Sequence, residues 1–188
     1  IITKINYDIS LYQDKFMNYD VSIIGSGPVG LCLAKALSSL DLRICIIDQQ
    51  SQSSLETPMD DGREVAITHL SKKILIELGS WDLIDQESIS LIKEAKVVNG
   101  LSPYSLHFNH QETKEETLGY LVPNRLIKAA AYRAISKLNN VDCLTETIAK
   151  EFLITEDGVT LNLSNGDTIT SDLLVAADGR LSGSRRQM

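Results

Sequence analysis

A glycine-rich segment at 25–30, Gly-Ser-Gly-Pro-Val-Gly, lies between two stretches of opposite character and constrains the fold more than any other feature. The residues before it, 19–24, favour a β-strand, whereas 31–37 carry apolar residues at helical spacing. A second apolar run, 42–47, suits a strand buried on both faces. Strand, helix and strand in this succession predict a βαβ unit.

The three glycines of this segment can hold an anion. Backbone N–H groups and the positive end of the helix dipole would face a pyrophosphate there. Gly25 would permit the tight turn, Gly27 the approach of the phosphate, and Gly30 the close contact of helix and strand. Glycine-rich turns are common, so a simple strand-to-helix turn is the alternative.

Asp48 ends the second predicted strand, eighteen residues after Gly30. A carboxylate at this position can accept hydrogen bonds from the ribose hydroxyls of an adenosine, and it would repel a 2′-phosphate. The βαβ unit therefore favours FAD or NAD over NADP as the bound dinucleotide. The alternative is a solvated acid at a strand end.

Composition and charge exclude other classes of protein. The chain is 43% hydrophobic and 23% charged, which is typical of a globular domain. With 25 acidic and 18 basic residues its net charge is −7, so we expect no nucleic-acid partner. Glycines, Pro28 and Lys35 interrupt the most apolar window, 21–40, and residues 1–16 do not follow the pattern of a signal peptide. We expect a cytoplasmic protein without a transmembrane helix.

The three cysteines, Cys32, Cys45 and Cys143, are odd in number and far apart in apolar surroundings. This pattern favours buried thiols over disulfides or a metal cluster. It fits a reducing compartment.

Two further helices are predicted. Helical spacing returns over 70–78, after a polar loop at 49–62, and Gly79 can end this helix as its left-handed cap. It returns again over 124–138, with Asn124 as the candidate N-cap.

Short strands are predicted in the second half of the chain. Three of them, at 95–98, 104–108 and 118–122, show no helical period and are assigned to a separate sheet. Asp-Gly and Asn-Gly pairs flanked by alternating apolar residues predict a three-strand meander over 146–171. The apolar run 173–177 is the last predicted strand.

Two segments, Asp61-Gly-Arg63 and the run LLVAADGRLSGSR at 173–185, resemble flavin-dependent aromatic hydroxylases of the para-hydroxybenzoate hydroxylase class. Over 19–185 the chain looks most like the hydroxylases of ubiquinone biosynthesis. The closest similarities are YDVSIIGSGPVGLCLAKAL, DGREVAITHLS, GYLVPNRL and LLVAADGRLS.

The resemblance implies an α/β fold, in which a FAD-binding Rossmann-like domain with a three-strand meander is joined to part of a second, substrate-side β-sheet. Residues 17–90 and 119–188 would form the FAD-binding domain, and 91–118 a fragment of the substrate-domain sheet. Residues 1–16 would be an extension outside the fold, with Met17 as the natural start.

The resemblance also implies roles for single residues. The three glycines would face the FAD pyrophosphate and Asp48 the adenosine ribose. Arg63 matches an arginine that lies along the flavin cofactor, and Arg125 a second cofactor-facing polar group, although both could be solvated cations. Ile148, in a strand after the second long helix, would offer its backbone to the adenine. Asp178 would act near the pyrophosphate and in presenting NAD(P)H, with a plain strand-end turn as the alternative.

The implied activity is that of a monooxygenase that reduces FAD with NAD(P)H and uses dioxygen to hydroxylate a polyprenylated phenol in ubiquinone biosynthesis. Such a small apolar substrate is compatible with peripheral association with the inner membrane or with a biosynthetic complex. No metal site is expected, because His107 and His110 lack further ligands at suitable spacing. No catalytic side chain is assigned, because the flavin carries the chemistry.

One feature of the family is not found in residues 1–188: a second flavin motif, Gly-Asp, downstream of the Asp178-Gly motif. The resemblance therefore covers about the first half of the family's length. By themselves these residues are expected to retain FAD weakly and to lack hydroxylase activity. A different FAD or NAD oxidoreductase and a truncated, non-catalytic FAD-binding fragment are the alternatives.

Overall fold

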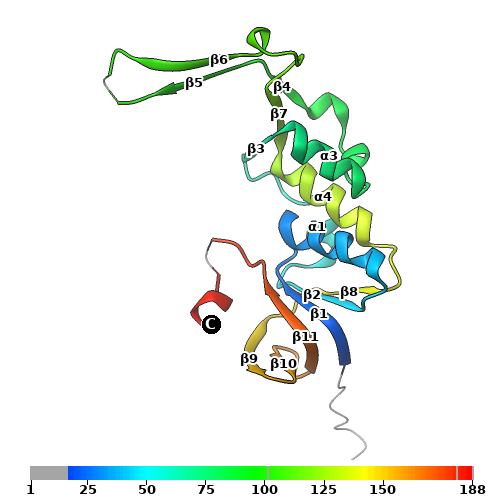
Figure 1. Cartoon of the computed structure of the whole chain (residues 1–188). Coiled ribbons are helices and arrows are strands. Elements are labelled where there is room, and N and C mark those ends of the chain that lie inside the picture. The colour runs from blue at the N-terminus through cyan, green and yellow to red at the C-terminus, as the bar shows by residue number, and fades with distance from the viewer. Residues whose placement is uncertain (1–16, 101, 181, 188) are drawn as a thin grey trace, which may run out of the picture.

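The computed structural model describes residues 17–100, 102–180 and 182–187. Figure 1 shows the parts of the molecule arranged in a row, with a large sheet at one end, helices in the middle and a long hairpin at the other end. The predicted extension, 1–16, lies outside the described residues.

The large sheet has six strands. In the order in which they lie side by side, they are β8 (Val141–Leu144), β2 (Ile44–Ile47), β1 (Met17–Ile24), β11 (Thr168–Ala176), β10 (Gly158–Leu163) and β9 (Ala149–Thr155). The first four run parallel to one another, and β10 and β9 continue the sheet as an antiparallel meander. All four residues of β2 are buried, as expected for an inner parallel strand.

Successive residues of β2 enter two different cores, because side chains alternate across a strand. Ile44 and Ile46 pack in a cluster with residues of α1 (Pro28–Leu37) and α4 (Asn124–Ile135). Cys45 and Ile47 belong to the other cluster, which is formed largely by the meander. All three cysteines are free thiols, and Cys45 is buried as predicted, whereas Cys32 and Cys143 are only partly buried. Burial raises the pKa of the Cys45 thiol to about 12.

The remaining helices are short. They are α2 (Gln52–Glu56) and α3 (His69–Glu77), together with 3-10 turns at Ser38–Leu40, Trp81–Leu83, Gln86–Ser88, His110–Glu112 and Ser184–Arg186. Leu55 of α2 is buried in the same core as α1 and α4. Gly79 follows α3 with φ +69°, so its predicted role as a left-handed cap is confirmed.

Two small antiparallel sheets complete the chain. One has the order β3 (Glu64–Ile67), β7 (Gly119–Pro123), β4 (Ser90–Ile92), and the other is the hairpin of β5 (Glu94–Val98) and β6 (Ser105–Asn109).

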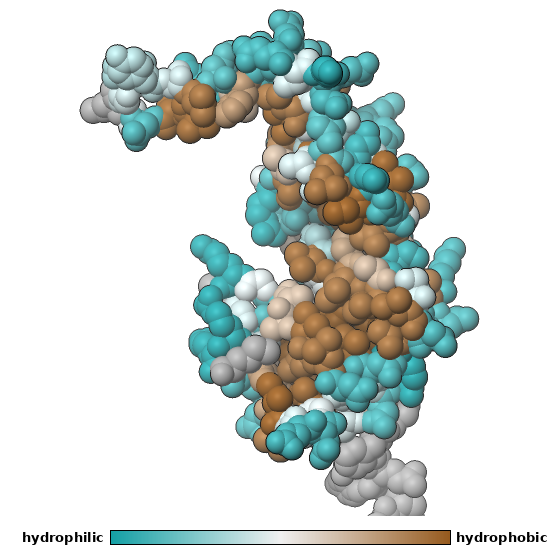
Figure 2. All heavy atoms as spheres, viewed as in Figure 1, coloured by the Kyte–Doolittle hydropathy of each residue, from teal (hydrophilic) through white to brown (hydrophobic). Residues whose placement is uncertain are grey.

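The hairpin has one apolar face. Directly paired residues point to the same side of an antiparallel ladder, so the pairs Ala95–Phe108 and Val97–Leu106 lie on one face. All four side chains are exposed, and Figure 2 shows the apolar surface along the hairpin.

Much of the predicted order is confirmed: the βαβ unit, both long helices and the meander all form. The third strand of the predicted meander and the predicted strand at 173–177 form one continuous strand, β11. The run 173–177 is not a separate strand, because β11 continues through it and pairs with β1 over its length and with β10 over its first half. The same strand thus joins the meander to the parallel sheet.

Three local predictions are wrong. The N-cap of α4 is Pro123 and not Asn124, whose side chain instead donates to Asp61 Oδ2 over 3.1 Å. The helix α4 itself ends at Ile135. Ile148 does not lie in a strand but in the loop before β9. The strands predicted at 118–122 and in the hairpin do not share a sheet, because β7 finds its partners in β3 and β4.

The glycine turn generates a prediction about stability. A Cβ atom added at Gly30 would lie 2.0 Å from Gly25 O, so Gly30→Ala must push helix α1 off the strand. We expect a loss of about 1–3 kcal/mol in the free energy of unfolding, the usual cost of overpacking. Urea unfolding measures it.

Gly183→Ala is the matched control, because Gly183 has φ −72° and no heavy atom within 4 Å of its added Cβ. It should unfold at the wild-type urea concentration. Equal stability of both variants would contradict the packing of α1 on Gly25.

Candidate functional site

The described residues form a cleft of about 480 Å³ at the carboxyl ends of β1, β2 and β11. Ligands of open α/β sheets bind at this edge. Five of the eight predicted site residues line it: Gly25, Gly27, Asp48, Ile148 and Asp178. The other lining residues are Ile24, Ile47, Gln49, Gln50, Thr147, Ala149, Ala177, Gly179, Gly183, Ser184 and Gln187.

The three glycines of the turn differ in the space around them. Gly25 has φ +108°, and a Cβ there would lie 2.5 Å from Ala177 O. Gly30 lies against the Gly25 carbonyl, as described above. Gly27, with φ −70°, has no heavy atom within 4 Å of an added Cβ. The fold therefore does not demand glycine at 27, and the open space suits a ligand that approaches the backbone.

The N-terminus of α1 opens at Gly27, which is its N-cap and offers no capping side chain. The first intrahelical bond runs from Leu31 N to Gly27 O, so the earlier N–H groups of this turn have no helical acceptor. The first turn carries no acidic residue. These donors and the helix dipole favour an anion, and the arrangement fits the pyrophosphate of a dinucleotide.

Asp48 ties the end of β2 to the glycine turn. Its Oδ2 accepts from Ser26 N and Ser26 Oγ, both at 2.7 Å. Its Oδ1 accepts from Gln50 N at 2.8 Å and from Gln50 Nε2 at 3.3 Å. Burial by itself would raise the pKa of this carboxyl, but the four hydrogen bonds outweigh burial and hold the pKa below its usual value. Asp48 is therefore ionised at neutral pH, and these bonds weaken only when the pH falls through that lowered pKa.

Asp178 also lines the cleft, just after β11. The preceding Ala177 donates from its N–H to Ile24 O over 2.8 Å, which places the Asp178-Gly motif against the glycine turn. Asp178 Oδ2 accepts from Ser184 N at 3.1 Å. Burial raises the pKa of Asp178, but bonds from Ser182 and Ser184 outweigh it and the net pKa is lowered. The carboxylate thus holds the following turn in place at the cleft wall.

Ile148 faces the cleft from the loop between β8 and β9. Its N–H donates to Ser164 Oγ at 3.0 Å, and its carbonyl accepts from Ser164 N at 2.9 Å. The N–H is thus occupied, whereas the carbonyl keeps a second lone pair. The half-exposed side chain also reaches the cleft. The adenine contact of Ile148 stays a prediction.

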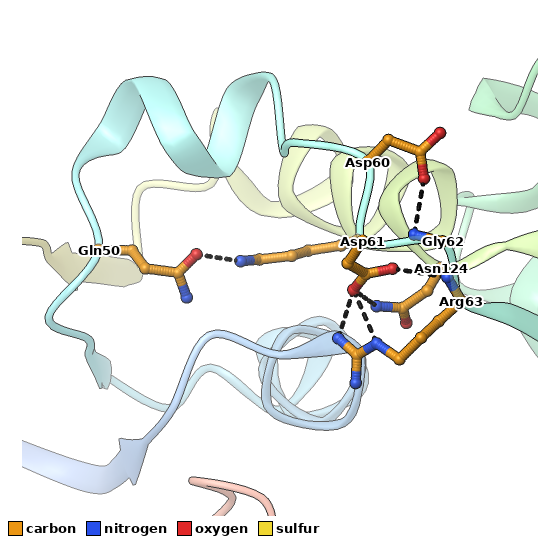
Figure 3. A network of polar contacts seen from close by, with 7 residues as sticks. Gln50, Asp60, Asp61, Gly62, Arg63 and Asn124 are labelled. Carbon is orange, nitrogen blue, oxygen red and sulfur yellow. Dashed lines mark hydrogen bonds and ion pairs between the residues drawn. The ribbon is translucent and has the colours of Figure 1, made fainter.

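The two arginines are not among the lining residues of the cleft. Arg63 Nε donates to Asp61 Oδ2 over 2.8 Å, and Arg125 Nε lies 3.5 Å from Asp60 Oδ2. Figure 3 shows Asp61 between Arg63 and Asn124, which donate to the same carboxylate. The hydrogen bonds from Arg63 lower the pKa of Asp61 to about 2. Each guanidinium keeps donors that its acid does not engage. The cofactor-facing roles of both arginines stay predictions.

Sequence reasoning missed Ser26, Gln50 and Lys128. Ser26 is fully buried and supplies two of the bonds to Asp48. Lys128 Nζ donates to Gln50 Oε1 over 2.6 Å and thereby links α4 to the cleft. No sequence pattern marks Gln50 or Lys128, because their contact joins segments 78 residues apart.

A second polar cavity of about 420 Å³ lies at the opposite end of the sheet. Its wall includes Asp20, Arg43, Asp157 and Asp172. None of the predicted cofactor-binding residues lines it.

A family model described as "FAD binding domain" matches residues 18–188. The chain belongs to this FAD-binding family. The predicted membership is thereby confirmed, and FAD is the cofactor that the family implies for the cleft.

Two curated relatives are ubiquinone hydroxylases. A ubiquinone hydroxylase of Neisseria meningitidis, UbiM, is 40% identical over 186 residues, which cover 96% of this chain and 40% of that protein. Another from Rhodospirillum rubrum, UbiL, is 35% identical over 163 residues, covering 87% and 38%. The chain thus spans about two fifths of the length of these relatives. Their similarity agrees with the predicted resemblance to the ubiquinone branch.

Solved structures agree on the fold. The FAD-dependent monooxygenase PqsL of Pseudomonas aeruginosa superposes with a TM-score of 0.71 at 19% identity, over 91% of this chain and 45% of that one. The flavin-dependent monooxygenase PieE, solved with FAD and substrate, gives a TM-score of 0.69 at 18% identity, over 91% and 32%. Among the described residues, no helix combines the length and apolar character needed to cross a membrane.

Gly27 provides a direct test of the pyrophosphate site. Gly27→Val places a branched side chain in the open space, so we expect FAD and ADP binding to fall at least tenfold, since two methyl groups displace the phosphate from its N–H donors. Calorimetric titration measures the affinity. Gly27→Ala, with one methyl group, should give an intermediate loss.

Unfolding curves for both Gly27 variants control for stability, since no heavy atom lies within 4 Å of the added Cβ. If Gly27→Val is stable and binds FAD with wild-type affinity, the assignment of the pyrophosphate to this turn is wrong.

Asp48 provides the test for the ribose. Asp48→Ala should weaken FAD binding by ~1–3 kcal/mol, the range for losing hydrogen bonds to a charged acceptor. Asp157→Ala removes an acidic charge at the exposed turn before β10 and should leave the affinity unchanged. An unchanged affinity in both variants would make Asp48 a purely structural residue.

Proposed function

We propose that this chain forms the FAD-binding part of a monooxygenase that hydroxylates a polyprenylated phenol in ubiquinone biosynthesis, with NAD(P)H as electron donor and dioxygen as oxygen donor. The observation that carries the proposal is the convergence of the glycine turn, Asp48 and Asp178 on one cleft, in a chain 40% identical to a ubiquinone hydroxylase over nearly its whole length.

Bound FAD would supply the redox chemistry, taking up electrons from NAD(P)H and delivering them to dioxygen. The residues of this chain would bind and orient it. The N–H groups at Gly27 and the first turn of α1 would hold the pyrophosphate, Asp48 would accept from the adenosine ribose, and Asp178 would border the pyrophosphate beside the glycine turn. Arg63 and Arg125 would contact the cofactor through the guanidinium donors that their acids do not engage.

The β5–β6 hairpin is proposed as part of the substrate side of the enzyme, within the fragment 91–118. Its face of Ala95, Val97, Leu106 and Phe108 is apolar and exposed. A prenylated phenol offers a large apolar surface, whose transfer from water to such a face is favourable. Residues 17–90 and 119–188 would then constitute the FAD-binding domain.

A cytoplasmic location is proposed, with association at the inner membrane surface or with a biosynthetic complex. The argument is chemical: a polyprenylated phenol resides in the bilayer, so the enzyme must meet it at the membrane surface. The partner proposed for the site is this small phenolic substrate.

The experiment is an oxygen-transfer assay on the full-length protein that contains this chain. With FAD, NADH or NADPH, a prenylated phenol and ¹⁸O₂, one labelled atom should enter the ring and the other should leave as water, with one NAD(P)H oxidised per product. Mass spectrometry measures the label. Oxidation of NAD(P)H with FAD bound but without ring labelling would contradict a hydroxylase and favour another FAD oxidoreductase.

A further inference from the structure

Lys128 projects from α4 toward the cleft without lining it. It is half-buried, and its Nζ donates to Gln50 Oε1 over 2.6 Å. Gln50 lines the cleft directly beside Asp48. The lysine therefore reaches the ribose side of the cleft only through the Gln50 amide.

This contact fixes the direction in which the Gln50 amide points. An ammonium group has three donors and no acceptor, so it can form a hydrogen bond only with the oxygen of an amide and not with its NH₂ group. With Oε1 turned to Lys128, the NH₂ group must face the other way, where Nε2 lies 3.3 Å from Asp48 Oδ1. A free glutamine could present either end to the cleft.

The charges around Lys128 hold it in this position. Burial lowers the pKa of the lysine, whereas the carboxylates of Asp48 and Asp61 act in the opposite direction and favour its charged form. Arg63, which is paired with Asp61, disfavours the charged form, and burial is the largest influence, so the net pKa of Lys128 is lowered. The Gln50 amide is the hydrogen-bonding partner of the ammonium.

The hydrogen bonds of Asp48 show where a ligand can enter. A carboxylate has about four lone-pair sites, and Ser26 and Gln50 together donate four bonds to Asp48. The bond from Gln50 Nε2 is the longest, at 3.3 Å, so it is the one that a ribose hydroxyl replaces most easily. The displaced NH₂ group then remains beside the carboxylate as a donor.

We propose that Lys128 is a positioning residue for the ribose of the bound nucleotide: it orients the Gln50 amide so that Nε2 stands as a hydrogen-bond donor next to the acceptor Asp48. A ribose carries neighbouring 2′- and 3′-hydroxyls, each of which both donates and accepts. One hydroxyl donates to Asp48 Oδ1, and the oxygen of its neighbour accepts from Gln50 Nε2. This assignment rests on the proposed function, since it requires an adenosine nucleotide in the cleft.

The test measures the binding of ADP to the chain by calorimetry. Lys128→Met removes the donor and keeps an unbranched side chain, so the amide can rotate and ADP affinity should fall about 2- to 10-fold, the range for one hydrogen bond. Lys128→Arg keeps a donor and should retain most of the affinity. Gln50→Ala should reproduce the loss, and Lys128→Met should add nothing to it in the double variant.

The nucleotide provides a second readout that a merely structural role would not change. With 2′-deoxy-ADP or 3′-deoxy-ADP, whichever lacks the hydroxyl that accepts from Gln50, the difference between wild type and Lys128→Met should disappear. Unfolding curves show whether each variant is folded. If Lys128→Met does not fold, Gln50→Ala, in the loop after β2, takes its place in the test.

The outcomes separate this inference from the proposed function. All variants are made in the full-length protein that contains this chain. If the wild-type protein binds neither ADP nor FAD, the proposed function fails. If it binds ADP and Lys128→Met binds equally well, the positioning role is wrong. If Lys128→Met weakens binding as much in the Gln50→Ala background, the lysine acts on the nucleotide directly and the route through Gln50 is overturned.

Discussion

The backbone of Gly25 lies against the backbone of Ala177, and the cleft depends on this approach. A Cβ at Gly25 would lie 2.5 Å from the Ala177 carbonyl oxygen, so only glycine allows the two segments to meet. Parallel pairing of β1 with β11 brings them together from positions about 150 residues apart along the chain. The glycine turn and the Asp178-Gly motif thereby become neighbouring parts of one cleft.

We propose that the cleft holds an anion although the protein has a net charge of −7. None of the described residues that line the cleft is basic. The attraction comes from backbone donors and the dipole of α1, which act over a short range. Three cations outside the lining have partners: Lys128 donates to Gln50, and Arg63 and Arg125 are paired with Asp61 and Asp60. Such pairing keeps a cation near the site while limiting unspecific attraction of other anions.

The sequence predicted those parts of the fold that depend on local pattern. The βαβ unit, α3 with its Gly79 cap, and the meander follow from periodicity and turn residues. Other features depend on partners distant in sequence. Asn124 was predicted to be an N-cap, but its side chain donates a hydrogen bond to Asp61 instead. The start of β9 after Ile148 is set by pairing with β10. Of the site, the glycines, Asp48 and Asp178 were predictable from motifs, whereas Gln50 and Lys128 emerge only when α4 packs beside the cleft.

The central claim is that the ADP half of FAD binds in the cleft through the N-terminus of α1. Amide chemical shifts of ¹⁵N-labelled protein, followed while ADP is added, test it most directly. The account predicts that the N–H signals of Gly27, Val29 and Gly30 shift most, together with those of Gln50 and Gly179. Shifts confined to the opposite cavity, at Arg43 and Asp157, or no shifts at saturating ADP, would contradict it.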